Sequence, residues 1–395
     1  WGLRTLREAI EQSMNVPAVI VSERLGVSTS VEYLKKMGIT TIVESGPRSD
    51  MFASALALGG MTRGISPLEL TSAYGSLANE GIHIKPQSFT KVTDRNGNVI
   101  LENKQLKNYV VDPKVSFIMT DMLKSAVDNG TGRKARLESN MPVAGKTGTT
   151  SDNYDAWFVG YTPYYVGGVW IGNDLQIDLG TGSSLSTTLW NKIMTEIHKD
   201  LPVKQFEKPE GIVQVAIDKV SGKLATELSA MDQRGSMVRN EYFIKGTEPT
   251  EYDDVHVKAT VCAESGKLAT NFCPDNLIGD QVFIKRPVPY NPEEHNGFVP
   301  SDYVYELPTE YCDIHTSNFI DNNPTDDLPF GTIVLPNGTK VLPDGRKLFL
   351  DGTIIYPDGT IIYPETESTS GEETDADDSD VVDSDESSII DSNND

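Results

Sequence analysis

The sequence has 395 residues, enough for two or more domains, and 38% of them are hydrophobic, a lower share than a fully globular chain usually has. We therefore expect part of the chain to be disordered. The formal net charge of −24 argues against nucleic-acid binding, and no stretch has the length and apolarity of a transmembrane helix. Because the sequence starts at Trp1 without a signal peptide, we expect it to be part of a longer protein.

Two short helices separated by a polar loop are predicted at the start of the chain. A capping-box pattern at Thr5 predicts a helix over residues 7–12, and a proline at the head of an apolar run predicts a second over residues 18–25. Ser13 and Asn15 lie in the loop between them, from which side chains can project into a cleft. Serine and asparagine before a proline are also common helix caps, so this pair alone does not indicate a catalytic role.

The middle of the chain is predicted to be mainly helical, with one hairpin. The amphipathic helix over residues 113–127 stops at Asn129-Gly130-Thr131-Gly132, whose two glycines suit a loop near a site. A turn at residues 94–97 predicts a hairpin between residues 82–93 and 99–101. The other helices are predicted over residues 30–37, 67–78 and 187–201.

The stretch with the clearest chemical character is Gly145-Lys146-Thr147-Gly148-Thr149-Thr150. It is not a phosphate-binding loop, because that motif needs a glycine where Asn140 stands and it opens a helix. Here two apolar, aromatic-rich runs follow, over residues 157–161 and 165–171, and they predict buried strands. We therefore place the stretch on a strand, where Lys146 and Gly148 share one face and the threonines at positions 147 and 149 share the other.

A six-residue phrase occurs twice after Pro202. Ser221–Thr226 and Ser265–Thr270 both read Ser-Gly-Lys-Leu-Ala-Thr, so we predict two copies of one small, β-rich unit. The sequence leaves open whether this unit is a scaffold or a binding module.

The three cysteines of the chain lie in or after the second copy. Cys262 and Cys273 align with other residue types in the first copy, and this paired difference predicts a disulfide between them. Cys312 is then left over. Zinc is the less favoured alternative, because the chain has no Cys-x-x-Cys pair and only 5 histidines.

Turn dipeptides recur at a fixed step near the end of the chain. They predict stacked short hairpins or a small solenoid, because the segments between them, such as Thr353–Tyr356, favour strands. The tail from Glu365 to Asp395 is acidic, rich in serine and free of aromatic residues, which predicts disorder. The turn dipeptides are Asn337-Gly338, Asp344-Gly345, Asp351-Gly352 and Asp358-Gly359.

Two motifs together give the chain a specific resemblance. Ser13-Met14-Asn15 fits a Ser-x-Asn element and Lys146-Thr147-Gly148 a Lys-Thr-Gly element, two of the three motifs of penicillin-reactive enzymes, in the order that these enzymes use. The phrases at residues 55–70, 129–132 and 155–163 add to the match. From Trp1 to about Pro202 the chain resembles the C-terminal half of the transpeptidase domain of class A penicillin-binding proteins, the bifunctional cell-wall synthases.

The third motif of that family, Ser-x-x-Lys, carries the nucleophile and should precede Ser13. Only 12 residues do so, and none of them fits it. The one literal match, Ser88-Phe89-Thr90-Lys91, comes later and lies in the predicted hairpin, where serine and lysine three residues apart point to opposite faces. Ser151-Asp152-Asn153 spells the second motif but follows Lys-Thr-Gly, so we interpret it as a turn. We therefore expect no nucleophile in this chain.

The resemblance implies an α+β fold, with an antiparallel sheet of about five strands flanked by helices. The first two strands of that fold precede the nucleophile, so the fold is expected to be incomplete here. We place the domain boundaries at residues 1–204 for the transpeptidase part, 205–320 for the β-rich extension, 321–363 for the turn repeats and 364–395 for the disordered tail. A membrane anchor, a glycosyltransferase domain and the first part of the transpeptidase domain are expected upstream.

The resemblance also implies roles for the motif residues in cross-linking peptidoglycan stem peptides, a reaction that β-lactam antibiotics block. Ser13 would relay a proton to the leaving amine, Asn15 would hold the substrate amide, and Lys146 would set the electrostatics near Ser13. Thr147, Gly148 and Thr149 would bind the substrate, with the threonines on its carboxylate. No metal or organic cofactor is implied, and the protein would act on the outer face of the cytoplasmic membrane.

Several alternatives share some of these features. A D,D-carboxypeptidase uses the same motifs. A β-lactamase needs an additional base to hydrolyse the acyl-enzyme, and the sequence shows no clear acidic loop for one. A non-catalytic module that binds the cell wall or another protein would be carried by the residues after Pro202.

Overall fold

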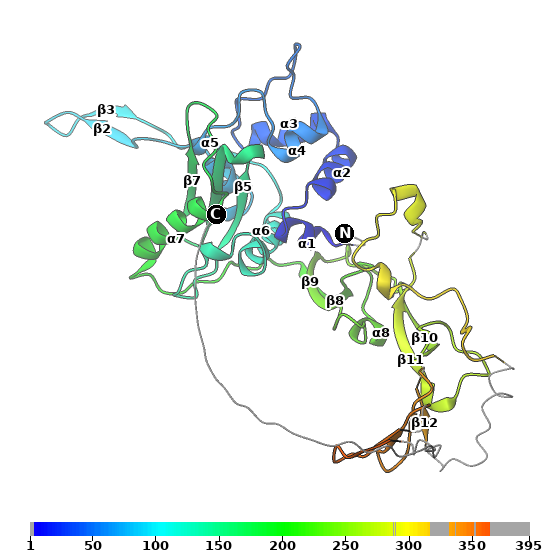
Figure 1. Ribbon diagram of the computed structural model, residues 1–395. Coiled ribbons are helices and arrows are strands. Elements are labelled where there is room, and N and C mark those ends of the chain that lie inside the picture. Colours follow the sequence, from blue (N-terminus) through cyan, green and yellow to red (C-terminus); the bar gives the residue numbers. More distant parts are fainter. Residues whose placement is uncertain are drawn as a thin grey trace, which may run out of the picture. The chain divides into compact units, whose positions relative to one another are not determined.

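The structure is a computed structural model that describes residues 4–286, 288, 290–316, 332–335, 337–350 and 353–363 (Figure 1). The chain forms two compact units. The first comprises Trp1–Val261 and Gly279–Tyr311, and the second comprises Cys262–Ile278 and Cys312–Asp395. The predicted acidic tail lies outside the described residues. None of the helices in the described ranges combines the length and the apolarity that crossing a membrane requires.

Five helices form the first part of the chain, and their ends follow local signals. Thr5 caps α1 through a complete capping box with Glu8, and Ser66 caps α5, whose first residue is Pro67. The second helix starts earlier than predicted, because its first residue is Asn15, before the proline. The helices are α1 (Leu6–Glu11), α2 (Asn15–Leu25), α3 (Val27–Lys36), α4 (Ala53–Leu58), which was not predicted, and α5 (Pro67–Ala78).

The predicted hairpin is correct in its second half only. Strands β2 (Lys91–Thr93) and β3 (Val99–Glu102) pair antiparallel across the turn, where the Asp94 side chain accepts a hydrogen bond from the backbone N–H of Asn98. Strand β1 (Ile82–Ile84) does not continue into β2; it pairs instead with β4 (Lys107–Tyr109). Because β4 is exposed along its whole length, its sequence carries no alternating pattern that would have predicted it.

A three-stranded antiparallel sheet lies at the centre of the first unit. It contains β5 (Ala144–Thr149), β6 (Asp155–Tyr161) and β7 (Val166–Gly172), in the order β5-β6-β7. The stretch that contains Lys146 therefore forms a strand, as predicted, and Ser151–Asn153 forms the short turn η2 between β5 and β6. The fold class is confirmed: antiparallel sheets combined with helices.

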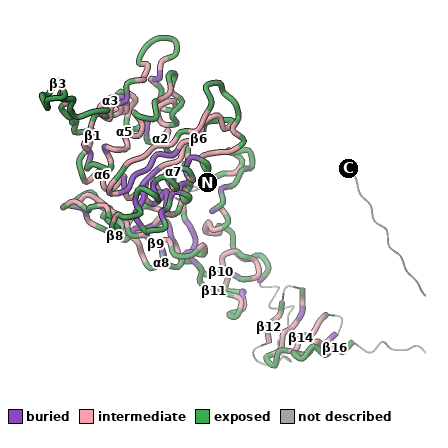
Figure 2. Tube along the Cα trace, turned by 90° about the vertical axis from the view of Figure 1, so that its left-hand side faces the viewer, coloured by how far each residue is buried: buried purple, intermediate pink, exposed green. Residues whose placement is uncertain are grey.

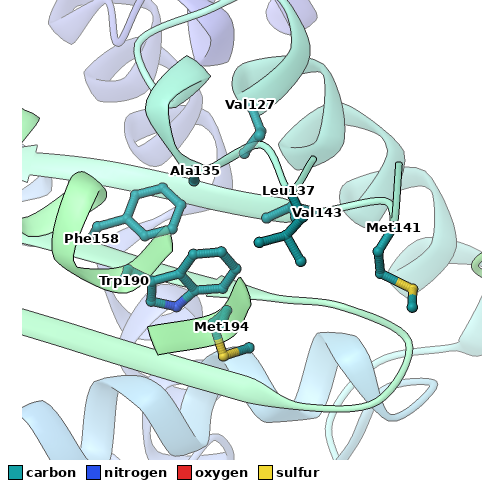
Figure 3. Close-up of a cluster of buried hydrophobic side chains, with 8 residues drawn as sticks. All are labelled: Val127, Ala135, Leu137, Met141, Val143, Phe158, Trp190 and Met194. Atoms are coloured by element: carbon teal, nitrogen blue, oxygen red, sulfur yellow. The ribbon is translucent and has the colours of Figure 1, made fainter. Parts of the chain in front are cut away.

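Helices cover both faces of this sheet. Trp190 of α7 (Ser184–His198) packs edge-on against Phe158 of β6 at a centroid distance of 5.1 Å, and Val127 and Met194 extend the same buried cluster (Figure 3). On the other face, Tyr161 packs with residues of α5 and α6 (Pro113–Asp128). Figure 2 shows the buried residues concentrated in this region. The core thus holds β5 rigidly from both sides.

The extension contains two strand pairs, one in each of the predicted copies. Strands β8 (Ile212–Asp218) and β9 (Val238–Ile244) pair in the first copy, and β10 (His256–Cys262) pairs with β11 (Ile278–Ile284) in the second. A short helix, α8 (Glu227–Ala230), follows the first six-residue phrase. The remaining single turns of 3-10 helix are η1 (Arg133–Ala135), η3 (Asp275–Leu277), η4 (Pro292–His295) and η5 (Tyr303–Tyr305).

The turn repeats form a five-stranded meander in the second unit, which confirms the prediction of stacked hairpins. Each strand has two residues, and Gly338, Gly345 and Gly359 adopt the positive φ that such turns require. The dipeptide Asp351-Gly352 lies outside the described residues. The strands are β12 (Ile333–Val334), β13 (Lys340–Val341), β14 (Lys347–Leu348), β15 (Ile354–Ile355) and β16 (Ile361–Ile362).

The predicted disulfide is not present in the structure, where Cys262, Cys273 and Cys312 are all free and buried. The prediction treated Cys312 as left over, but Cys312 joins the other two in one cluster. His315, three residues after Cys312, completes the group, and ligand atoms of all four residues lie within 4.8 Å of one another. A two-residue disulfide therefore does not describe this arrangement.

A buried charge cluster connects the extension to the first helix. Arg7 of α1 donates a hydrogen bond of 2.6 Å to Glu241 of β9 and another of 2.6 Å to Asp121 of α6. One turn later, Glu11 accepts a hydrogen bond of 2.9 Å from Arg239 of β9. Only 6% of the Arg7 side chain is exposed. The cluster therefore fixes α1 between α6 and β9.

We expect Arg7→Met to lower the free energy of unfolding of the chain by about 3 kcal/mol, because the variant removes the cation beside the partly buried Asp121 and leaves Glu241 with Arg239 at 3.6 Å. The control is Lys36→Met, which removes an exposed ion pair with Glu32 and should change the stability much less, because water screens exposed charges. Urea unfolding of both variants measures the difference. Equal losses in the two variants would show that the buried cluster does not stabilise the chain.

Candidate active site

Ser13 lies at the sharp turn between α1 and α2. Its backbone is left-handed, with φ of 55°, a conformation that costs a serine on the order of 1 kcal/mol. The turn is held by hydrogen bonds from Ser13 N to Ile10 O and from Met14 N to Ala9 O. The Ser13 side chain is exposed, and Asn15 follows as the first residue of α2. The loop therefore presents both predicted side chains to solvent at a fixed position.

Lys146 of β5 reaches across to this turn. Its Nζ donates a hydrogen bond of 2.7 Å to Ser13 Oγ and one of 3.1 Å to the carbonyl of Thr147. Burial lowers the pKa of Lys146 to about 8, because an ammonium group is less stable where water is partly excluded. Near neutral pH, this amine can therefore both give up and take back a proton at the Ser13 hydroxyl.

The loop after α6 joins the Ser13 turn to the edge of β5. Thr131 N donates a 3.0 Å hydrogen bond to the carbonyl of Glu11, and Thr131 Oγ1 lies 2.6 Å from Thr147 Oγ1. At Gly130 the backbone passes so close to α1 that a Cβ would lie 2.1 Å from the Glu11 carbonyl oxygen. Only glycine fits there without a shift of backbone, so the prediction that this glycine-containing loop lies near the site is correct.

The end of β5 contacts the segment that leads into α7. Thr149 Oγ1 accepts a hydrogen bond of 3.3 Å from the backbone N–H of Ser183. Gly148 pairs with Trp157 of β6, and a Cβ at Gly148 would lie 3.2 Å from the Trp157 side chain. Sequence reasoning missed the contribution of Ser183, because no motif marks it.

Two hollows meet at this strand, with volumes of about 500 and 600 Å³. Both are large enough for a small peptide or a drug-sized ligand. Ser13 lines the first, Trp157 lines the second, and Asn15, Leu58 and the Lys146–Thr149 segment line both. All six predicted site residues therefore lie around one opening, although their roles stay predictions.

Ser88, the serine of the literal Ser-x-x-Lys match, is not part of this site. It is exposed, lies in a bend before β2 and is absent from the lining of both hollows. It is also not on a helix, so Lys91 is not positioned one helical turn away to activate it.

The arrangement can hold an anionic, extended ligand and move a proton beside it. Lys146 supplies positive charge, while the threonine hydroxyls at positions 147 and 149 can donate hydrogen bonds to a carboxylate. The Ser13 hydroxyl, in contact with the amine, can pass a proton between Lys146 and a bound group. Neither hollow is lined by a histidine, a cysteine or a cluster of carboxylates that would suit a metal.

Comparisons with known protein families find two matches. The family described as "Penicillin binding protein transpeptidase domain" matches residues 1–195. The family described as "Penicillin-binding protein 1A, C-terminal domain" matches residues 208–258 and, a second time, residues 257–292. The repeated match falls on the two copies that the six-residue phrase predicts.

Curated relatives and solved structures agree with these families. Penicillin-binding protein 1A of Clostridium botulinum (strain Langeland) is 44% identical over 288 residues, which cover 72% of this chain and 34% of the relative. Penicillin-binding protein 1A of Clostridium novyi is 39% identical over 329 residues, covering 82% and 36%. The chain thus spans about a third of the length of these relatives. The crystal structure of penicillin-binding protein 1A from Haemophilus influenzae is similar in fold, with a TM-score of 0.52 and 24% identity over 63% of this chain and 41% of that one.

We expect Lys146→Met to stabilise the folded chain at pH 7, by about 1 kcal/mol after allowance for partial exposure and for the lost hydrogen bonds. Burial lowers the pKa of Lys146 below its unfolded value, so the wild-type chain carries the full cost of a buried charge below pH 8. That cost falls as the pH rises from about 8 to 10.5, and the difference between variant and wild type should shrink over the same window.

Chemical unfolding at pH 7 and pH 10 measures this difference. The control is Lys124→Met, which removes a surface ion pair with Asp128 and should change stability by less than about 1 kcal/mol. A Lys146→Met chain that is less stable than wild type at pH 7 would contradict the claim that the buried ammonium of Lys146 destabilises the folded chain.

Proposed function

The chain belongs to the penicillin-binding protein family, with transpeptidase-domain residues followed by the 1A-type C-terminal domain, and we propose that it forms part of the active site of a serine-type peptidoglycan D,D-transpeptidase. One observation carries the proposal. Lys146 Nζ contacts Ser13 Oγ at 2.7 Å beside the Thr147–Thr149 segment, at the opening of two ligand-sized hollows. The stem peptide is the proposed substrate, and β-lactams are proposed to bind at the same place.

In the proposed reaction, a serine hydroxyl attacks the penultimate D-alanine carbonyl of a stem peptide. The new ester bond forms as the bond to the terminal D-alanine breaks, and the departing amine needs a proton. Ser13 would deliver that proton and Lys146 would replace it from its ammonium form, which would be restored by the proton that the attacking serine hydroxyl loses; the 2.7 Å contact between Lys146 Nζ and Ser13 Oγ supports this relay. An amine on a neighbouring strand then takes the acyl group, releases the serine and returns a proton to the site.

The other site residues position the substrate. Asn15 lines both hollows next to Ser13 and would hold the peptide amide through its side chain. Thr147 and Thr149 would bind the terminal carboxylate of the substrate with their hydroxyls, assisted by the positive charge of Lys146. The backbone N–H of Thr149 would supply one donor for the oxyanion that forms during attack.

The nucleophilic serine is proposed to come from residues outside this sequence. The one Ser-x-x-Lys in these 395 residues is Ser88–Lys91, which lines neither hollow. We therefore infer that the chain alone does not form an acyl-enzyme. We also propose that the complete protein carries a glycosyltransferase domain and an anchor that holds it on the outer face of the membrane.

The test uses a longer protein in which the upstream residues are restored, and it measures the rate of labelling by a fluorescent penicillin. We expect Lys146→Ala to slow acylation by about 100-fold or more, because a group acting on the developing charge of the transition state is lost. Ser88→Ala and Lys91→Ala serve as matched controls and should label at the wild-type rate. Unchanged labelling of Lys146→Ala, or loss of labelling in Ser88→Ala, would refute the proposal.

A further inference from the structure

The second copy in the extension contains a cluster of four residues that the catalytic proposal does not use. Cys262 ends β10, Cys273 follows the repeated phrase, and Cys312 and His315 come from a separate segment. The three cysteines are buried with 0%, 7% and 6% of their surface exposed, and His315 with 1%. All four belong to the second compact unit.

The geometry within the cluster is close to that of a four-coordinate metal site. His315 Nδ1 lies 3.3 Å from Cys262 Sγ and 3.3 Å from Cys312 Sγ. Tetrahedral zinc with bonds of about 2.3 Å to sulfur and about 2.0 Å to nitrogen would separate these atoms by roughly 3.5 Å. A small outward movement of the side chains would therefore admit the ion.

The surroundings of the cluster are also those of a metal site. The other ring nitrogen of His315, Nε2, lies 2.8 Å from a carboxylate oxygen of Glu264, and such a carboxylate fixes the tautomer in which Nδ1 is the ligand. Backbone N–H groups point at two of the sulfurs, from Thr270 to Cys273 at 3.3 Å and from His315 to Cys312 at 3.4 Å. Hydrogen bonds of this kind stabilise thiolates.

A second repeated phrase shows which residues correspond in the two copies. Residues 249–256 read Pro-Thr-Glu-Tyr-Asp-Asp-Val-His, and residues 308–315 read Pro-Thr-Glu-Tyr-Cys-Asp-Ile-His. Cys312 therefore aligns with Asp253, and His315 aligns with His256. The surrounding contacts agree, because Lys223 pairs with Asp254 in the first copy and Lys267 pairs with Asp313 in the second.

In the first copy, the histidine is surrounded by carboxylates instead of cysteines. His256 Nδ1 lies 3.2 Å from Asp218 and 2.9 Å from Asp253, and its Nε2 lies 2.8 Å from Asp232. Burial lowers the pKa of His256, but hydrogen bonds to Asp253 and Asp232 and the charge of Asp218 outweigh it, so the net shift is upward. This shift favours the protonated imidazole, whose charge would balance the surrounding carboxylates.

All three non-histidine positions change together between the copies. Asp218, Ser229 and Asp253 in the first copy become Cys262, Cys273 and Cys312 in the second. A disulfide would account for two of these three changes. It would not explain why a third cysteine and a histidine lie in the same cluster. A metal site needs all four residues.

From this cluster we infer that the second copy binds one Zn²⁺ ion through Cys262, Cys273, Cys312 and His315. Three thiolates and one imidazole are a ligand set that zinc prefers, in tetrahedral geometry. Because the protein supplies all four ligands and they are buried, no coordination position is open to a substrate. The site is therefore structural: the ion joins the loop after β10 to the segment at residues 312–315.

The test measures the metal content of the full chain, purified without a histidine tag under reducing conditions, by mass spectrometry of the elements. We expect one zinc per chain in the wild type and a loss to background in Cys273→Ser. Ser229→Ala, at the corresponding position of the first copy, is the matched control and should keep its zinc. A chain without zinc, or zinc retained in full by Cys273→Ser, would overturn the proposal.

A second measurement does not depend on the folding of any variant. Wild-type chain in which Co²⁺ replaces zinc should show thiolate-to-cobalt charge transfer and the strong visible absorption of tetrahedral cobalt. The weak spectrum of octahedral cobalt would refute the site. So would a purified, non-reduced chain in which denaturation exposes only one titratable thiol, because that result means that two of the cysteines form a disulfide.

Discussion

The buried contact between α1 and β9 is the constraint on which the site depends. Arg7 and Glu11 lie on α1 and are held by charged residues of β9 and α6, and Ser13 follows within two residues of Glu11. A shift of α1 along its axis would move Ser13 Oγ away from Lys146 and break the 2.7 Å contact. The carbonyl of Glu11 also receives the Thr131 N–H, so the same helix end positions the loop beside Thr147. Strand β9 of the extension therefore helps to hold the helix that leads into the candidate site.

The candidate site contains two features that reduce the stability of the folded chain. The left-handed backbone of Ser13 and the partly dehydrated amine of Lys146 are both unfavourable, and the packing on the two faces of the sheet holds them in place. A lysine whose pKa is near 8 can exchange a proton with a hydroxyl at the pH of the cell, whereas an ordinary lysine remains charged. The two copies in the extension differ at their centres. In the first copy a histidine lies among three carboxylates, and in the second a histidine lies among three cysteines that are proposed to bind a metal ion.

Local signals in the sequence predicted much of this structure. The capping box at Thr5, the proline that opens α5 and the Lys-Thr-Gly strand each act within a few residues, so they could be interpreted without knowledge of the fold. The pairing of β1 with β4 and the contact of Arg7 with Glu241, which are 234 residues apart, depend on tertiary packing and left no local pattern. The arrangement of the cysteines differs from the predicted pair for a different reason. The spacing of the cysteines alone gives no sign of His315, which lies three residues after Cys312. The second repeated phrase aligns both residues with the first copy, and this phrase is the signal that could have identified the cluster.

The central claim is that this chain supplies the proton-transfer and substrate-binding side of a transpeptidase site, but not its nucleophile. Labelling of the 395-residue chain with fluorescent penicillin, followed by mass mapping of any adduct, tests this claim most directly. The account predicts no covalent adduct on the chain alone. An adduct on Ser13 or Ser88 would contradict it, because the nucleophile would then lie within these residues.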